Sequence, residues 1–226
     1  MTIKEKISRI LPVYGWVPLA AELTLNMLVY SGAKLIAGKW YHYNLETSLD
    51  RAIPFIPWTV LIYFGCYLFW AANYVICVRQ GRREAYRFLS ADFLAKCICL
   101  FFFLGLPTTN IRPEVTGSSI WDEAMRFLYW VDSADNLFPS IHCLTSWMCY
   151  IGIRGRKNIP FWYRGFSCLM AAAVFISTLT TKQHVVVDVA GGVLLAEICY
   201  WIAGRTRLGE WYGQLFTRVS AYIFRT

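Results

Sequence analysis

The sequence contains little charge. Asp, Glu, Lys and Arg make up 16% of the 226 residues, whereas hydrophobic residues make up 57%. Soluble domains typically contain about 25% charged residues, so this composition excludes an ordinary soluble protein. Several apolar runs approach the roughly 20 residues that a helix needs to cross a bilayer. We therefore expect an all-α integral membrane protein that forms a single transmembrane domain over residues 1–226.

Other features that would indicate different classes of protein are also missing. The eight cysteines lack zinc-finger spacing and lie in or beside apolar runs, so we expect neither a metal site nor a disulfide. We find no internal repeat and no low-complexity tract. The basic start leads into a long apolar run without a small-residue cleavage site, which predicts that no signal peptide is removed.

Apolar segments predict a bundle of six membrane-spanning helices, at about 11–31, 57–78, 91–107, 140–154, 161–181 and 184–203. The connections between them alternate in charge. One set carries most of the basic residues: Lys4, Lys6, Arg9; Arg79, Arg82, Arg83, Arg87; Arg154, Arg156, Lys157, Arg164; Arg205, Arg207, Arg218 and Arg225. Because basic loops remain in the cytoplasm, we expect both termini there. The net charge of +8 then reflects topology and not nucleic-acid binding.

The first long connection on the outer side covers about residues 32–56. It ends in DRAIPFIPW (50–58), which contains Pro54 and Pro57. Proline lacks the N–H that a helix interior requires, so we expect that no helix forms here before the second span.

The second long outer connection covers about residues 108–139 and contains SSIWDEAMRFLYWVD. Ser118 or Ser119 can cap a helix, Asp122 and Glu123 fall in its first turn, and apolar residues follow on one side. We predict an amphipathic helix between the third and fourth spans. It either lies on the outer membrane surface or packs as an ordinary loop helix.

Three polar clusters lie near the outer ends of the predicted spans. They are Arg112-Pro113 after the third span, Pro139-Ser140-Ile141-His142 at the start of the fourth, and Lys182, His184 and Asp188 between the fifth and sixth. Odd-numbered spans end, and even-numbered spans begin, on the same side of the membrane. The clusters therefore converge on one face. Since ionisable residues are costly within a membrane, this convergence predicts a functional site on the extracytoplasmic face.

Each cluster alone also has a structural interpretation. His184 and Asp188 could form a packing pair one turn apart, Ser140 could cap a helix, and Arg112 could anchor to lipid phosphates. Their joint occurrence, in this order and on one side, favours a site.

Together these clusters resemble the signature of the type 2 phosphatidic acid phosphatase superfamily. That signature contains a lysine and an arginine-proline pair, then proline-serine-glycine-histidine, then serine-arginine followed by a histidine and an aspartate. Arg112-Pro113, PSIH at 139–142, and Ser177 with His184 and Asp188 match it. DRAIPFIPW and QHVVVDVAGG look more like the branch with inositol phosphorylceramide synthases and related bacterial membrane proteins. The resemblance implies a catalytic core at about 50–204 and the bacterial cytoplasmic membrane as location.

The chain departs from the signature at three positions. Gly105 stands where the family has lysine, Ile141 where it has glycine, and Thr178 where it has arginine. Two phosphate-holding cations are therefore missing, and Lys182 is the candidate replacement for one of them.

The chemistry of the remaining residues agrees with the roles that the resemblance implies. His184, held by Asp188, can attack phosphorus, and His142 can protonate the leaving oxygen. The expected phosphate-binding groups are Arg112, Ser140, Lys182 and the free N–H groups at the starts of the fourth and sixth spans. No cofactor is expected, and His42 is expected to be a surface histidine.

We therefore expect a membrane lipid phosphatase or phosphotransferase that transfers a phospho group to water or to an alcohol. With two cations missing, a phosphodiester lipid is favoured slightly over a monoester. Two alternatives remain. One is a metal-dependent hydrolase with His142, His184 and Asp188 as ligands, and the other is a non-catalytic relative that binds or moves lipid. The expected partners are the bilayer and a lipid substrate, and the oligomeric state stays open.

Overall fold

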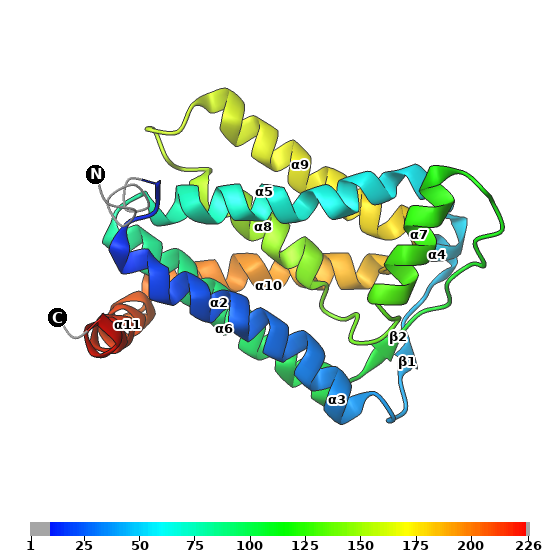
Figure 1. Ribbon diagram of the computed structural model, residues 1–226, viewed down its shortest axis with the longest axis horizontal. Coiled ribbons are helices and arrows are strands. Elements are labelled where there is room, and N and C mark those ends of the chain that lie inside the picture. Colours follow the sequence, from blue (N-terminus) through cyan, green and yellow to red (C-terminus); the bar gives the residue numbers. More distant parts are fainter. Residues whose placement is uncertain (1–9, 225–226) are drawn as a thin grey trace.

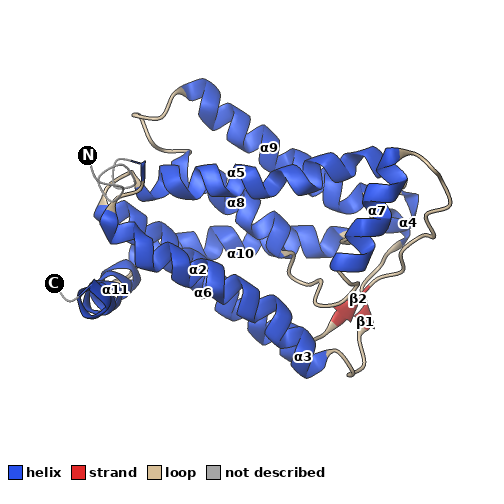
Figure 2. Ribbon diagram, in the orientation of Figure 1, coloured by secondary structure: helices blue, strands red, loops and turns tan. Residues whose placement is uncertain are grey.

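The computed structural model describes residues 10–224, and helices run along its longest axis (Figure 1). Within these residues, the strands are one short parallel pair, β1 (Tyr43–Asn44) and β2 (Thr108–Thr109), which Figure 2 shows at one end of the molecule. Apart from this pair, the expected all-α architecture is confirmed for the described residues.

Four helices within residues 10–224 are long and apolar enough to cross a membrane. They are α5 with its preceding turn (Pro57–Val78), α6 (Arg82–Gly105), α9 (Phe161–Thr180) and α10 (Val186–Arg205). The fourth predicted span corresponds to α8 (Ile141–Ile153), whose 13 residues fall short of the roughly 20 that a crossing needs. The first predicted span corresponds to one continuous helix. It consists of α2 (Trp16–Met27), a π-helical turn (Leu28–Gly32) and α3 (Ala33–Ala37). The six-span layout therefore remains a prediction.

The predicted start of the third span is wrong. We expected it near residue 91, but α6 begins at Arg82 and includes Arg83 and Arg87 in its first turns. Arginine is a good helix former, so a start inferred from apolar residues alone comes too late. The guanidinium of Arg87 also lies 4.3 Å from the ring centre of Tyr200, which fixes this end of α6 against α10.

The expectation that no helix forms before the second span is also wrong. A short helix, α4 (Ser48–Ala52), forms because Thr47 and Asp50 make a capping box, in which the Thr47 N–H donates to Asp50 Oδ2 at 2.8 Å. The prolines act just after it. The chain is extended at Ile53, and α5 starts only after the turn that Pro57 opens.

The predicted helix in the second outer connection is confirmed as α7 (Ile120–Val131). Ser119 is its N-cap and forms a capping box with Asp122. Met125 and Leu128 are buried against the start of α5, whereas Ile120, Phe127 and Trp130 are exposed. Its position on a membrane surface remains a prediction.

The C-terminal helix α11 (Leu208–Phe224) was not expected. It is seen nearly end-on in Figure 1, so it lies across the long helices, at the end of the molecule opposite α7. Tyr212 and Phe216 are buried where it packs on α6. Of the predicted basic residues, Lys4, Lys6, Arg9 and Arg225 lie outside the described residues.

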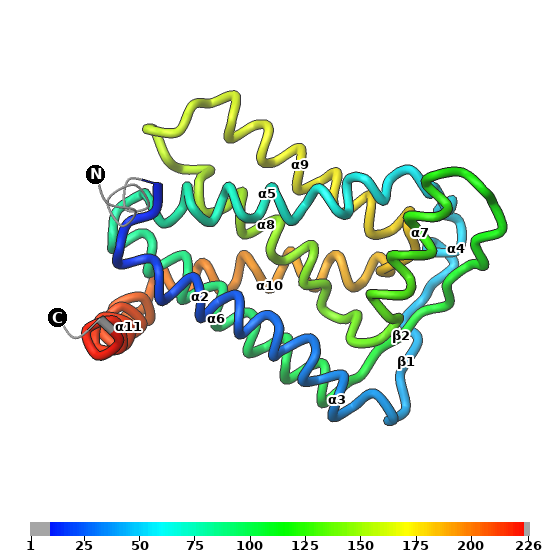
Figure 3. Tube along the Cα trace, viewed as in Figure 1, coloured from blue at the N-terminus to red at the C-terminus, as the bar shows by residue number. Residues whose placement is uncertain are grey.

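Segments that are distant in the sequence lie side by side, and Figure 3 shows this for α2 and α6. A buried ion-pair network, which the sequence analysis missed, joins them. Lys96 Nζ lies 2.8 Å from Asp92 Oδ2 and 3.6 Å from Glu22 Oε2. The hydroxyl of Tyr74 donates to Asp92, and that of Tyr212 donates to Glu22. The network therefore connects α2, α5, α6 and α11.

Candidate functional site

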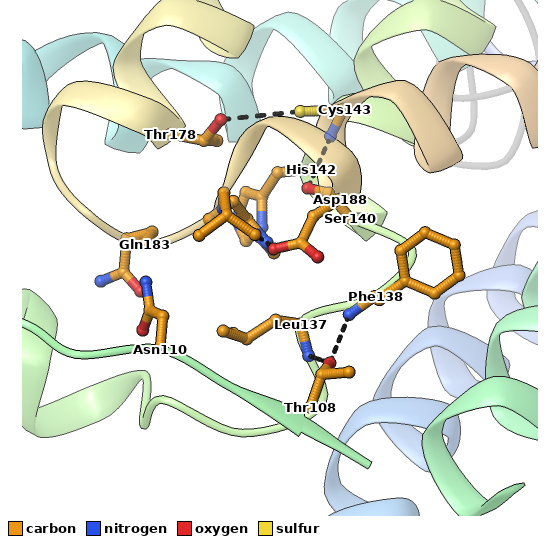
Figure 4. Close-up of polar contacts among 12 residues, drawn as sticks. Thr108, Asn110, Leu137, Phe138, Ser140, His142, Cys143, Thr178, Gln183 and Asp188 are labelled. Carbon is orange, nitrogen blue, oxygen red and sulfur yellow. Dashed lines mark hydrogen bonds and ion pairs between the residues drawn. The ribbon is translucent and has the colours of Figure 1, made fainter. Parts of the chain in front are cut away.

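The starts of α8 and α10 bring the two predicted histidines together. The ring centroids of His142 and His184 are 6.0 Å apart. Ser140 caps α8, and its N–H donates to the carbonyl of Asp188 at 3.1 Å, which ties the two helix starts to each other. Two of the three clusters predicted from the sequence thus meet at one place (Figure 4).

The loop before α8 is held by the short strand pair. The hydroxyl of Thr108, in β2, accepts the N–H groups of Leu137 and Phe138 at 3.1 and 2.8 Å (Figure 4). These bonds fix the chain just before Ser140, so β2 helps to set where His142 lies.

His184 is paired with a buried carboxylate. Its Nδ1 lies 3.3 Å from Asp188 Oδ2, and that oxygen also accepts the N–H of Val185 at 3.0 Å. His184 is 8% exposed and Asp188 is 0% exposed. In the tautomer with a proton on Nδ1, that proton can be donated to Asp188, and Nε2 then carries the free lone pair.

His142 is surrounded by aromatic hydroxyls. The Tyr63 ring lies 4.4 Å from the His142 ring, and its hydroxyl lies 3.3 Å from Nδ1. The Tyr67 hydroxyl lies 3.3 Å from Nε2. Tyr63 also donates to Asp132 Oδ2 at 2.6 Å, and Tyr30 donates to Asp132 Oδ1. A chain of contacts therefore runs from Asp132 through Tyr63 to His142.

Asp132 lies at the C-terminal end of α7. Burial alone would raise the pKa of its carboxyl, but His142 and the hydroxyls of Tyr30 and Tyr63 lower that pKa below its usual value. The sequence analysis did not identify Asp132, because nothing in its local pattern shows that it lies near His142.

Arg112 reaches the same site, and its side chain is already anchored there. It donates to the carbonyl of Asp132 and to Oε1 of Gln183, and its guanidinium lies 4.8 Å from the ring centre of Tyr129. A guanidinium has five N–H donors, so these two bonds leave others for a ligand. The third predicted cluster therefore joins the other two, although the phosphate contact of Arg112 remains a prediction.

Lys182 lies in surroundings that differ from those of Arg112. Its backbone is left-handed, with φ of +54°, and its ammonium donates to the carbonyls of Asp50 and Ile53 at 2.8 and 2.6 Å. It lines a cavity of about 540 Å³, of which His184 forms part of the wall. Two of its three N–H groups are thus used, and its role as a replacement cation remains a prediction.

Several of the backbone donors expected at the helix starts are occupied. The N–H of Val186 donates to Asp50 Oδ1 at 2.6 Å, that of Val185 donates to Asp188, and that of Cys143 donates to Ser140 Oγ. The prediction of free N–H groups is therefore wrong for these three residues, because carboxylate and hydroxyl caps from the chain itself take them.

Two buried neutral residues, Thr178 and Gln183, lie next to the histidines. Thr178 is completely buried, and its carbonyl accepts the N–H groups of Gln183 and His184 at 3.0 and 3.1 Å. In Figure 4 its side chain points toward Cys143. Gln183 is 1% exposed, and its Nε2 has no hydrogen-bond partner among the described residues. It is a buried neutral donor beside the histidines, which sequence reasoning missed although it directly precedes His184.

A cavity of about 330 Å³ lies against this cluster, and its wall contains both histidines together with Gln183 and Asp132. His184 lines both this cavity and the one at Lys182. His42 lies elsewhere, beside β1, where its Nδ1 is 2.8 Å from the carbonyl of Trp40. Within residues 10–224, no group of three or more His, Cys, Asp and Glu side chains is arranged to hold a metal ion.

A family model described as PAP2 superfamily matches residues 39–202, a range that includes every residue of the site just described except Tyr30. Neither a curated protein nor a solved structure gives a significant match to the chain.

Proposed function

The chain belongs to the PAP2 superfamily, and on this premise we propose that it is an integral membrane enzyme that cleaves the phosphoester of a membrane lipid. Membership supports chemistry of the phosphatase or phosphotransferase type. The observation that carries the specific mechanism is the pair of histidine rings 6.0 Å apart, one of them held by a buried aspartate.

His184 is the proposed nucleophile. With Nδ1–H donated to Asp188, Nε2 attacks phosphorus, the N–P bond forms and the P–O bond to the leaving alkoxide breaks. The Asp188 carboxylate stabilises the positive charge that develops on the ring.

His142 is the proposed general acid. It gives its proton to the leaving oxygen, and it then accepts a proton from water or an acceptor alcohol whose oxygen attacks phosphorus and breaks the N–P bond. The Tyr63 hydroxyl lies 3.3 Å from Nδ1 of this ring and donates at 2.6 Å to Asp132, so the carboxylate holds the group that orients His142.

The phosphate-binding groups are Arg112, Ser140 and Lys182, with Gln183 added from the structure. Arg112 supplies charge and fixed geometry, and Gln183 Nε2 supplies a neutral donor. Ser140 is buried and caps α8, so it also helps to hold His142 in position.

A phosphodiester lipid fits these groups better than a monoester. A monoester carries close to two negative charges at neutral pH, whereas a diester carries one, and an unpaired charge in a low-dielectric site costs several kcal/mol. Thr178 cannot supply a cation, and Lys182 shares its ammonium with two carbonyls. The branch resembling inositol phosphorylceramide synthases would move a phospho-headgroup to an alcohol, and release to water or monoester hydrolysis is the alternative.

The proposed topology has six spans, with both termini in the cytoplasm and the histidines on the extracytoplasmic side of a bacterial cytoplasmic membrane. Two observations support it. The site lies at the end of the bundle that carries α7, and the arginine-rich start of α6 lies at the opposite end, near α11 (Figure 1). Arginine-rich segments stay in the cytoplasm.

The test is a panel of lipid phosphates and phosphodiesters incubated with purified full-length protein, its His184→Ala variant and its His42→Ala variant. We expect turnover by the native protein and by His42→Ala, and none by His184→Ala. The same panel with a chelator separates the two alternatives. Loss of activity would favour metal ligation by His142, His184 and Asp188, and no turnover of any lipid would favour a non-catalytic lipid-binding relative.

A further inference from the structure

The cavity beside the two histidines has a lining whose charge opposes that of the chain. Of the side chains that line it, two are carboxylates, Asp132 and Asp135, and none of those described is lysine or arginine. The whole chain has 22 Lys and Arg against 14 Asp and Glu. We infer that this cavity binds the cationic amine headgroup of a phosphodiester lipid; this rests on the proposed function and names its substrate class.

Within residues 10–224, the two carboxylates together make a single ion pair with lysine or arginine. Asp132 is held by neutral donors, the hydroxyls of Tyr30 and Tyr63, and it makes no ion pair with lysine or arginine within the described part of the chain. Asp135 accepts from Ser133 Oγ at 3.0 Å, and it forms an ion pair at 4.0 Å with Lys34, which is 45% exposed. A cation in the cavity would therefore meet two carboxylates. Asp132 has no lysine or arginine ion pair among the described residues, and the ion-pair partner of Asp135 is largely exposed.

Aromatic side chains also line the cavity. Tyr30, Tyr67 and Trp70 line it together with Phe64. The face of such a ring attracts an ammonium group, most strongly for Trp, and the attraction increases where water is excluded. Rings together with carboxylates select a cationic amine over an uncharged alcohol or a second anion.

Asn136 provides a separate observation that indicates a ligand. It lines the cavity, is 4% exposed, and neither its Nδ2 nor its Oδ1 has a hydrogen-bond partner among the described residues. Buried amides are normally satisfied, so an unpaired one beside a cavity indicates a missing partner. Its left-handed backbone, with φ of +55°, fixes it in the loop directly after Asp135.

The position of the cavity relative to the histidines sets which part of the substrate enters it. Because His142 and His184 line the same cavity, a phosphate held between them places one of its two ester substituents there. The carboxylates make the cavity unfavourable for a second phosphate or an inositol phosphate. A primary ammonium would donate to Asp135 and Asn136, and a quaternary ammonium would contact the rings.

The first arm of the test measures kcat/KM of the full-length protein in mixed micelles containing one phospholipid at a time. Phosphatidylcholine, phosphatidylethanolamine and phosphatidylglycerol with identical acyl chains all present a diester, and only the first two carry a cation. We expect turnover of the amine lipids to be about 10-fold faster than that of phosphatidylglycerol. Asp135→Asn should remove most of this preference by slowing the amine lipids alone. Glu114→Gln, which removes an exposed carboxylate from the same outer side, should leave the preference intact.

The second arm measures binding without turnover, by calorimetric titration of glycerophosphocholine, glycerophosphoethanolamine and glycerophosphoglycerol into the purified protein at low temperature. We expect the two amine diesters to bind about 10-fold more tightly, and Asn136→Ala to weaken the ethanolamine ester more than the choline ester. This arm keeps the inference testable if Asp135→Asn fails to fold. Absence of lipid turnover together with selective amine binding would contradict the proposed function and support the headgroup site. Equal binding of all three esters, or an unchanged preference in Asp135→Asn, would overturn the headgroup site whatever the turnover.

Discussion

Replacing Tyr63 by phenylalanine should test the proposed role of His142 as the general acid. Tyr63 is completely buried, its ring lies over His142, and its hydroxyl contacts both His142 Nδ1 and Asp132 Oδ2. Phenylalanine keeps the ring and removes only the hydroxyl. His142 then loses the contact that orients its ring, and Asp132 loses one of its two phenolic donors.

The size of the effect follows from what the hydroxyl does. Loss of a general acid altogether costs roughly 100- to 10,000-fold. Tyr63→Phe leaves the acid present but loosens its position, so we expect a loss of about 10- to 100-fold in kcat for a lipid with a poor leaving group. For a nitrophenyl phosphodiester, whose leaving group needs no proton, we expect a loss of less than about threefold.

Tyr30→Phe is the matched control. Tyr30 donates to the other oxygen of the same carboxylate, and no contact of its hydroxyl with His142 is found among the described residues. We expect Tyr30→Phe to change KM for lipid, since Tyr30 lines the cavity, and to show the same kcat ratio between the two substrates as the native protein. Equal losses on both substrates for Tyr63→Phe, or the same leaving-group dependence in both variants, would refute the positioning role.

Three further predictions concern stability, substrate charge and topology. Lys96→Met should lower the free energy of unfolding by about 3–5 kcal/mol, measured by thermal unfolding in detergent, because two carboxylates remain buried without their cation; a change below about 1 kcal/mol would show that the network is solvated. Lys182→Ala should leave the diester-to-monoester preference unchanged or increase it, whereas a monoester preference that survives in this variant would contradict the charge-matching argument. Reporter domains inserted after Gly81 and after Ser119 should report opposite sides of the membrane, and reporters on the same side would be incompatible with the six-span layout.

Local signals in the sequence were sufficient where one short segment determines the structure. The capping box of α7 is formed by Ser119 and Asp122, three residues apart, and could be predicted from the sequence alone. The start of α6 at Arg82 was not predicted, because we located helices by their apolar residues and its first turns contain arginines. The short helix α4 was not predicted either, because its Thr47–Asp50 capping box lies just before two prolines.

The same distinction applies to the residues of the candidate site. His142, His184 and Asp188 were identified because their spacing and order are distinctive. Asp132 and Gln183 were not, because their importance depends on contacts with residues that are distant in the sequence. Lys96 was also missed, because its partner Glu22 lies on another helix. The capping of α10 by Asp50 was missed for the same reason, since Asp50 is distant in the sequence from the Val186 N–H that it accepts.

The central claim is that phosphorus is transferred through His184, and trapping the phospho-enzyme tests it most directly. Full-length protein would be incubated with a lipid labelled at phosphorus, quenched with denaturant at alkaline pH, where N–P bonds survive, and the labelled residue located by peptide mass spectrometry. We predict label on His184 and none anywhere in His184→Ala. With a nitrophenyl substrate, we predict more label in His142→Ala than in the native protein, because breakdown of the phospho-enzyme is slowed. Label on another residue, or label that persists in His184→Ala, would contradict the mechanism.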